Sequence, residues 1–252
     1  MIQNFRGKNV FITGTRRGIG RELVRAFAMR GASIYAHARK ASEEFEAHNA
    51  ELAQNYGVTI RPVYFDMTDE NAMKAAVQEI MKEMSPHILI NNAGICKLNK
   101  VLDFGRADWD PMIDVNLTAA FELSYEAAKI MIPQKSGKII NICSLFSYLG
   151  GQWSPAYSAT KHALAGFTKA YCDELGQYNI QVNGIAPGYY ATDITLATRS
   201  NPETNQRVLD HIPANRWGDT QDLMGAAVFL ASPASNYVNG HLLVVDGGYL
   251  VR

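Results

Sequence analysis

Residues 9–20 read Asn9-Val10-Phe11-Ile12-Thr13-Gly14-Thr15-Arg16-Arg17-Gly18-Ile19-Gly20, and the architecture of the chain can be worked out from this run. Four strand-forming residues lead into a glycine-rich turn, after which a helical pattern begins. Glycine lets a backbone turn sharply and approach a phosphate closely, and the amino terminus of a helix presents unpaired N–H groups. The placement therefore favours a phosphate-binding loop, with Gly14, Gly18, Ile19 and Gly20 as candidate contacts, over a plain structural turn.

Strand-like and helical patterns alternate along the rest of the chain. Because parallel strands joined by helices form one sheet covered on both faces, the pattern predicts an α/β fold: a doubly wound, parallel, seven-stranded sheet in a single domain over residues 1–252. Pro62 lies within the third run, which suits an edge strand. Residues 187–215 form the most irregular segment, and we expect a lid or binding loop there. The strand-like runs are 9–12, 32–36, 59–65, 88–90, 139–142, 180–182 and 242–245.

Composition excludes several classes of function. The 252 residues include 24 Lys plus Arg and 24 Asp plus Glu, so the chain lacks the basic excess that nucleic-acid binding needs. No apolar run is long enough to span a membrane, and the amino terminus lacks a signal-peptide pattern, so we expect a cytoplasmic protein. Cys96, Cys143 and Cys172 share no metal-binding or disulfide spacing, and the expected chemistry needs no metal.

Tyr157 and Lys161 stand four residues apart in a segment with a helical pattern, so both side chains project from one face. A tyrosine hydroxyl titrates near pH ~10, and it exchanges protons at neutral pH only where a fixed positive charge stabilises the phenolate. Lys161 supplies such a charge. Ser144 follows the apolar run 138–143 at the expected carboxyl edge of the sheet, where its hydroxyl can polarise a carbonyl. Alone, the Tyr–Lys pair would be read as a surface pair; this context favours catalysis.

The residues at the end of the second predicted strand indicate which nicotinamide cofactor the chain prefers. NAD enzymes of this architecture usually place an acidic residue there for the ribose hydroxyls, whereas NADP enzymes supply a cation for the 2′-phosphate. Here Ala38 occupies the expected acidic position and Arg39 follows it, with Arg17 in the glycine-rich loop. The two guanidinium groups predict a preference for NADP(H) over NAD(H). The alternative is that these arginines are solvated surface charges, which we expect of Arg16 and Lys40.

Taken together, the motifs of this chain resemble those of the short-chain dehydrogenase/reductase superfamily, over the whole length and in the same order. The resemblance implies a Rossmann-like fold and an oxidoreductase. The segments 140–144, 179–189, 216–219 and 238–248 are similar to those of the gluconate 5-dehydrogenase, or 5-keto-D-gluconate reductase, family. The motifs that carry the superfamily resemblance are Thr13-Gly14-x-x-x-Gly18-Ile19-Gly20, Asn91-Asn92-Ala93-Gly94, Asn116, Ser144, Tyr157-x-x-x-Lys161 and Pro187-Gly188.

The resemblance implies roles for the catalytic residues. Tyr157 would donate a proton in reduction and accept one in oxidation, and Lys161 would lower the pKa of Tyr157 and hold the nicotinamide ribose. Ser144 would hydrogen-bond the substrate oxygen as charge develops on it. Asn116 would hold a water that relays protons from Lys161 to solvent; the alternative is a polar residue that merely bends its helix.

Roles in cofactor binding are also implied by the resemblance. Asp66 would bind the adenine amino group, and Asn92 and Gly94 would lie along the adenosine ribose and pyrophosphate. Pro187, Gly188 and Thr192 would position the nicotinamide. Family members usually form homotetramers through helices at about 109–132 and 156–175 and through the last strand, so a homotetramer is expected.

The predicted function is NADP(H)-dependent interconversion of a secondary alcohol and a ketone, on a sugar, sugar acid or polyol. Two alternatives remain: reduction of a 3-oxoacyl thioester by the same site chemistry, and a catalytically idle protein that senses NADPH. The segment after Ser144, residues 145–153, is more aromatic than a pocket dedicated to a carboxylated sugar needs. The candidate pocket residues, each of which could instead serve packing or the surface, are Lys97, Trp153, Tyr189, Tyr190 and Arg199.

Overall fold

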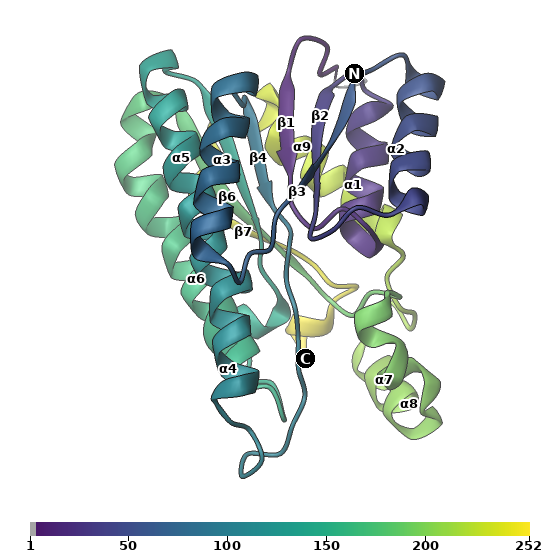
Figure 1. The fold of residues 1–252 in the computed structure, drawn as a ribbon. Coiled ribbons are helices and arrows are strands. Elements are labelled where there is room, and N and C mark those ends of the chain that lie inside the picture. Colours follow the sequence, from purple (N-terminus) through teal and green to yellow (C-terminus); the bar gives the residue numbers. More distant parts are fainter. Residues whose placement is uncertain (1–3) are drawn as a thin grey trace.

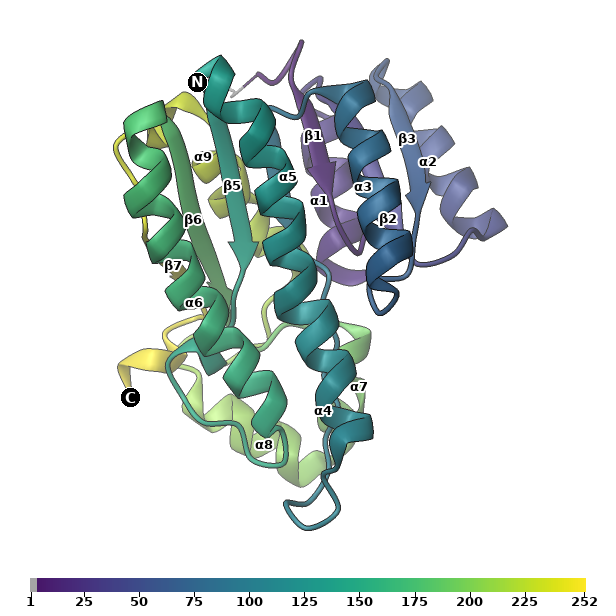
Figure 2. The same ribbon diagram turned by 60° about the vertical axis from the view of Figure 1, so that its left-hand side comes forward.

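The computed structural model describes residues 4–252 and contains one seven-stranded sheet with helices on both faces (Figures 1 and 2). All neighbouring strands pair in parallel, in the order β3-β2-β1-β4-β5-β6-β7. The predicted single-domain, doubly wound fold is therefore confirmed. The strands are β1 (Asn9–Ile12), β2 (Ser33–Ala38), β3 (Ile60–Tyr64), β4 (Ile88–Asn91), β5 (Gly137–Ile142), β6 (Ile180–Pro187) and β7 (Leu242–Val245).

Alternation along each strand feeds two separate cores. Val10 packs into the core on one face and Phe11 into the core on the other, because successive side chains of a strand point to opposite faces. Leu89 and Ile90 in β4 divide in the same way, and the strands read as continuous apolar runs because both faces are covered. The edge position predicted from Pro62 is confirmed, since β3 pairs only with β2.

Three long helices cover each face. Helices α1 (Gly18–Ala28), α2 (Glu43–Tyr56) and α9 (Met224–Ala231) lie on one side of the sheet, and α3 (Glu70–Met84), α5 (Ala119–Gln134) and α6 (Pro155–Leu175) lie on the other (Figures 1 and 2). Local signals set their ends: the Ser42 hydroxyl accepts the Phe45 N–H at the start of α2, and left-handed Gly57 ends that helix. Helix α4 (Arg106–Ile113) joins α5 through a π-helical turn over Asp114–Thr118.

The segment predicted to be an irregular loop over residues 187–215 is largely helical. It contains α7 (Leu196–Ser200) and α8 (Pro202–His211), which lie beyond the carboxyl edge of the sheet (Figure 1). The turn residues near Pro202 are a helix cap: the Asn201 side chain accepts the N–H groups of Glu203 and Thr204, both at 3.1 Å. Pro202 then occupies the first helical position, where its missing N–H costs nothing.

Candidate active site

Ser144 and Tyr157 come together at the carboxyl edge of the sheet. Ser144 follows β5 by two residues, and its hydroxyl accepts the Phe146 N–H at 3.2 Å, which caps a short 3₁₀ turn. Tyr157 lies in the first turn of α6, and its ring packs edge-on against that of Phe146 with 5.8 Å between centroids. Burial raises the pKa of the Tyr157 hydroxyl, and its hydrogen bond with Ser144 opposes that rise.

Lys161 lies one turn further along α6 and is 3% exposed. Its ammonium group is 5.5 Å from the centroid of the Tyr157 ring and donates a hydrogen bond to the Ile142 carbonyl at 2.7 Å. Burial lowers the pKa of Lys161. The helix is held at this point by the Ser147 hydroxyl, which donates to the Lys161 carbonyl at 2.8 Å. The structure thus brings the two residues together, while an effect of Lys161 on the Tyr157 pKa stays a prediction.

Asn116 lies in the π-helical turn between α4 and α5 and is 1% exposed. Its side chain accepts the Ile95 N–H at 2.8 Å and donates to the Ile95 carbonyl at 2.9 Å and to the Thr160 hydroxyl at 3.3 Å. A methyl group added at Gly94 would lie 3.5 Å from the Asn116 side-chain oxygen and 3.7 Å from the Lys161 nitrogen. Asn116 therefore secures the backbone beside Lys161, which is a structural task in addition to any relay.

The glycine-rich loop has the shape of a dinucleotide cradle. Gly14 and Gly18 adopt φ values of +67° and +57°, which favour glycine. A Cβ at Gly20 would lie 2.1 Å from the Gly14 carbonyl oxygen, so only glycine fits there. Ile19 is half-buried between Gly18 and Gly20 in the first turn of α1, where no side chain caps the helix and no acidic residue is present. The free N–H groups and the positive end of the helix dipole fit a pyrophosphate.

Asn92 and its neighbours support this loop from β4. The Asn92 side chain donates to the carbonyls of Thr13 at 2.8 Å and Gly14 at 3.0 Å, so its amide braces the loop. Asn91 is directed elsewhere: its amide nitrogen donates to Ser124 and Asn141 inside the fold. Asn91 therefore ties β4 to α5 and β5 inside the fold.

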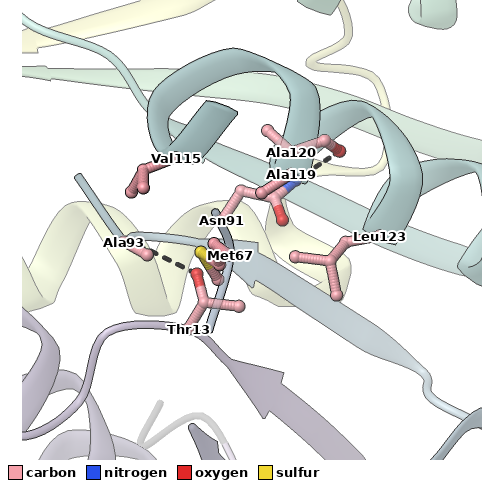
Figure 3. Close-up of a pocket in the computed structure, with 8 residues that line it drawn as sticks. All are labelled: Thr13, Met67, Asn91, Ala93, Val115, Ala119, Ala120 and Leu123. Atoms are coloured by element: carbon pink, nitrogen blue, oxygen red, sulfur yellow. Dashed lines mark hydrogen bonds between the residues drawn. The ribbon is translucent and has the colours of Figure 1, made fainter. Parts of the chain in front are cut away.

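The residues shown in Figure 3 surround a gap between β1, β4 and α5 that is too narrow to hold a water molecule. Met67, which directly follows Asp66, lines it together with Ala93 and Val115, and the Thr13 hydroxyl accepts the Ala93 N–H at 2.9 Å (Figure 3). Asp66 itself accepts the N–H and the hydroxyl of Thr68 at 3.0 and 2.8 Å. These hydrogen bonds lower the pKa of the Asp66 carboxyl, with smaller contributions from Arg39 and Lys40.

The two arginines assigned to the 2′-phosphate differ in their surroundings. Arg39 is exposed and forms no ion pair within residues 4–252. Arg17 forms an ion pair with Asp193 at 3.2 Å, which links the glycine-rich loop to the segment after β6. Both side chains of this pair are mostly exposed, and such pairs are worth only ~0–1 kcal/mol, so a phosphate can compete for Arg17.

Pro187, Gly188 and Thr192 lie where β6 ends at the same edge of the sheet. A Cβ at Gly188 would lie 2.6 Å from the Asp246 Cα, so the need for glycine here is explained by packing against the turn after β7. A Cβ at Gly18 would lie 3.6 Å from the Thr192 side chain, which places Thr192 across from the glycine-rich loop. The segment after β6 therefore faces the loop over the expected path of the dinucleotide.

The candidate substrate residues differ in their surroundings. Tyr190 is a packing residue, since it is 5% exposed and its hydroxyl donates to the Val245 carbonyl at 3.1 Å. The Lys97 ammonium group forms an ion pair with the Asp108 carboxylate at 3.3 Å. Trp153 is 48% exposed with φ of +64°, and Tyr189 packs against aromatic neighbours. Arg199 donates to the Thr192 carbonyl at 3.0 Å and forms no ion pair within the described part of the chain.

Sequence reasoning missed three residues of this site. His37 at the end of β2 hydrogen-bonds the glycine-rich loop, and no spacing rule indicates such a contact. Asp193 could not be paired with Arg17 before the fold was known. Cys96 hydrogen-bonds the Ser154 hydroxyl at 3.4 Å, and Ser154 directly precedes the helix that carries Tyr157, so the thiol lies beside the site.

Within residues 4–252, no group of three or more His, Cys, Asp or Glu side chains is arranged to hold a metal ion. In the same part of the chain, no helix combines the length and the apolar character needed to cross a membrane.

Known proteins resemble this chain over its whole length. It is 72% identical over 250 residues to the uncharacterized oxidoreductase YgcW of Escherichia coli K12, covering 99% of this chain and 95% of the relative. It is 42% identical over 250 residues to 5-keto-D-gluconate 5-reductase of Escherichia coli K12, covering 97% of this chain and 96% of the relative. The solved structure of a gluconate 5-dehydrogenase from Burkholderia cenocepacia J2315, in complex with NADP and tartrate, has a TM-score of 0.92 and 38% identity, covering 100% and 99% of the two chains.

The family model described as enoyl-(acyl carrier protein) reductase matches residues 14–250, from the glycine-rich loop to the 3₁₀ turn that follows the last strand. The predicted superfamily and the predicted likeness to gluconate 5-dehydrogenases are confirmed by these matches. With this fold, this glycine-rich loop and these relatives, the chain belongs to the short-chain dehydrogenase/reductase family.

Proposed function

We propose that this protein is an NADP(H)-dependent oxidoreductase that interconverts a secondary alcohol and a ketone on a sugar acid, a sugar or a polyol. The observation that carries the proposal is the meeting of Ser144, Tyr157 and Lys161 at the carboxyl edge of the sheet. Further support comes from the relatives, whose names refer to 5-keto-D-gluconate and gluconate, and from the NADP in the Burkholderia structure.

In reduction, the Tyr157 hydroxyl donates its proton to the carbonyl oxygen of the substrate, and the Ser144 hydroxyl donates a hydrogen bond to the same oxygen. Lys161 holds a positive charge close to Tyr157 and stabilises the phenolate that remains. Asn116 fixes the backbone beside Lys161 and holds the water of a proton relay. When bound, the nicotinamide supplies or accepts the hydride.

For the cofactor, we assign the pyrophosphate to Gly14, Gly18, Ile19 and Gly20 at the uncapped amino terminus of α1. The adenosine half takes Asp66 and Gly94, with Asn92 bracing the loop. Pro187, Gly188 and Thr192 position the nicotinamide. The preference for NADP(H) rests on Arg39, which is exposed and free of an ion pair within residues 4–252, and on Arg17.

The segment 187–215 is proposed to bind substrate, because α7 and α8 lie beyond the carboxyl edge where the catalytic residues meet (Figure 1). Arg199 in α7 and Arg207 in α8 both lack an ion pair in the described part of the chain. Arg199 is the candidate partner for a substrate carboxylate, because its side chain is half-buried and donates to the Thr192 carbonyl, whereas Arg207 is exposed.

A cytoplasmic homotetramer is proposed as the working form. Four aromatic side chains lie together on α5 and α6: Phe121 stacks on Tyr125 at 6.1 Å and meets Phe167 at 6.4 Å, and Phe167 packs on Tyr171 at 4.1 Å. Phe121 and Tyr125 remain 42% and 47% exposed, and an exposed apolar cluster marks an interaction surface. Analytical ultracentrifugation tests this: a monomer at micromolar concentration would contradict the proposal.

The test of function is oxidation of NADPH, and separately of NADH, with a panel of carbonyl compounds. The panel contains 5-keto-D-gluconate, neutral ketoses, a diketone and a 3-oxoacyl thioester. We expect turnover of 5-keto-D-gluconate or a related keto acid with NADPH. Turnover of the thioester alone would favour the acyl reductase, an alternative kept because of the family description. Tight NADPH binding without any turnover would instead indicate a sensor.

A further inference from the structure

His37 joins two segments of the nucleotide site through one imidazole ring. The residue is 3% exposed at the end of β2. Its Nδ1 accepts the Gly14 N–H at 3.2 Å, and its Nε2 lies 3.0 Å from the Phe65 carbonyl oxygen. The ring also stacks on that of Phe65, with 4.0 Å between centroids. One partner lies in the glycine-rich loop and the other directly precedes Asp66.

The two partners determine the protonation state of the ring. A carbonyl oxygen can only accept, so Nε2 carries the proton, and a backbone N–H can only donate, so Nδ1 carries a lone pair. Burial lowers the pKa of His37 to about 4, which keeps the ring neutral near pH 7. The ring therefore acts as an acceptor toward the loop and as a donor toward the strand end.

The contact determines how the Gly14 peptide is oriented. Its N–H is held by His37 and its carbonyl by Asn92 at 3.0 Å, so both polar groups of this residue are fixed by side chains. Gly14 has φ of +67°, and a Cβ at this position would lie 2.7 Å from the Ala93 Cα. The position of Gly14 sets that of Gly20, since the Gly14 carbonyl packs against it.

We propose that His37 is a positioning residue for the nucleotide: through Nδ1 it orients the Gly14 peptide and so preorganises the glycine-rich loop for NADP(H). The inference rests on the proposed function, since it concerns the same cofactor site. His37 touches neither the reacting atoms nor Tyr157, so it acts on cofactor affinity and leaves the chemical step alone. Preorganisation raises affinity because the loop is already ordered before NADP(H) binds, so binding does not carry the free-energy cost of ordering it.

Two substitutions separate the two hydrogen bonds of the ring. His37→Asn places an amide oxygen near the position of Nδ1 and retains the acceptor for Gly14, whereas His37→Gln places a donor near Nε2 and retains only the bond to Phe65. His87→Gln is the matched control, because His87 Nδ1 accepts the Asn9 N–H at 3.0 Å at the opposite end of β1. All three variants remove a buried or half-buried imidazole: His37 lies in β2, and His87 directly precedes β4.

The measurements are NADPH dissociation constants by fluorescence titration of the full chain, together with KM for NADPH and kcat. We expect His37→Gln to raise the dissociation constant and KM about tenfold or more, as an unsatisfied buried N–H in the loop implies. We expect kcat at saturating NADPH to change less than about threefold. His37→Asn should recover most of the affinity, and His87→Gln should bind NADPH as the wild type does.

Equal losses of affinity in His37→Asn and His37→Gln would overturn the proposal, because packing of the ring would then be the cause. An equal loss in His87→Gln would overturn it as well, because general destabilisation would suffice. Wild-type affinity in His37→Gln would overturn this inference alone. Failure of the wild-type protein to bind NADPH would overturn the proposed function, and the inference with it.

Discussion

Replacing Asn116 by alanine should lower both stability and activity. The side chain makes hydrogen bonds of 2.8 and 2.9 Å to the two polar backbone groups of Ile95 and one of 3.3 Å to Thr160. A hydrogen bond contributes a net ~0.5–1.5 kcal/mol, and buried partners left unpaired cost more, so the loss should be about 2–3 kcal/mol. For a chain of this size, about 2–4 °C of Tm per kcal/mol predicts a fall of roughly 4–12 °C.

Asn183 provides a matched control for this substitution. It is also 1% exposed, and it too ties down backbone: it donates to the Val238 carbonyl at 2.8 Å and accepts the His241 N–H at 3.0 Å. Asn183→Ala should therefore lower the free energy of unfolding by a similar amount. The hydrogen bonds of Asn183 join β6 to the loop before β7, away from Tyr157. The kcat of the Asn183→Ala variant should therefore stay within about threefold of wild type.

Urea denaturation measures the stability of both variants, and kcat is measured well below both melting temperatures. Asn116→Ala should reduce kcat about 10- to 100-fold, because Ile95 and Gly94 can then shift beside Lys161 and small misplacements are costly. The reasoning is refuted if both variants keep the same kcat, since the site would then tolerate the movement. Unchanged stability in Asn116→Ala would refute the hydrogen-bond argument itself.

Three further substitutions test separate parts of the site, and a fourth, Gly225→Ala, is the control for Gly20→Ala. Tyr157→Phe should reduce turnover at least 1,000-fold while NADPH still binds in a fluorescence titration, since only the hydroxyl is removed; appreciable turnover would remove the proton-donor role. Arg39→Ala should raise KM for NADPH at least tenfold and KM for NADH little, and equal effects in steady-state kinetics would exclude contact with the 2′-phosphate. Gly20→Ala should abolish NADPH binding, because its Cβ would meet the Gly14 carbonyl at 2.1 Å. Gly225→Ala in α9 has no atom within 4 Å of its Cβ, so it should raise Tm by a few degrees in a thermal melt. Binding by the Gly20 variant would show that the loop can relax.

Most of the fold could be predicted from residue patterns. All seven strands were expected, because short apolar runs between helical patterns are strong local signals, although β6 (Ile180–Pro187) extends beyond the expected run 180–182. The segment 187–215 was expected to be an irregular loop, although Asn201 and Pro202 within it are equally good at starting a helix. Local signals of a cap and of a turn use the same residues, so packing decides between them.

The candidate site was predictable where its residues lie close together along the chain. Tyr157 and Lys161 share a helix face by their spacing, and Ser144 follows a buried strand, so their meeting needed only the sheet topology. The bracing role of Asn92 and the pairing of Arg17 with Asp193 could not be read from the sequence. Each depends on which side chain lies opposite after the chain has folded.

The sequence by itself determined the parallel sheet, the glycine-rich turn after β1 and the shared helix face of Tyr157 and Lys161, because periodicity and glycine placement act within a few residues of one another. Tertiary structure alone decided that Lys161 donates to the Ile142 carbonyl and that His37 spans the glycine-rich loop and the end of β3. Those contacts join separate strands and helices. Their geometry follows from how the layers pack, and a flexible side chain finds its partner only once that packing exists.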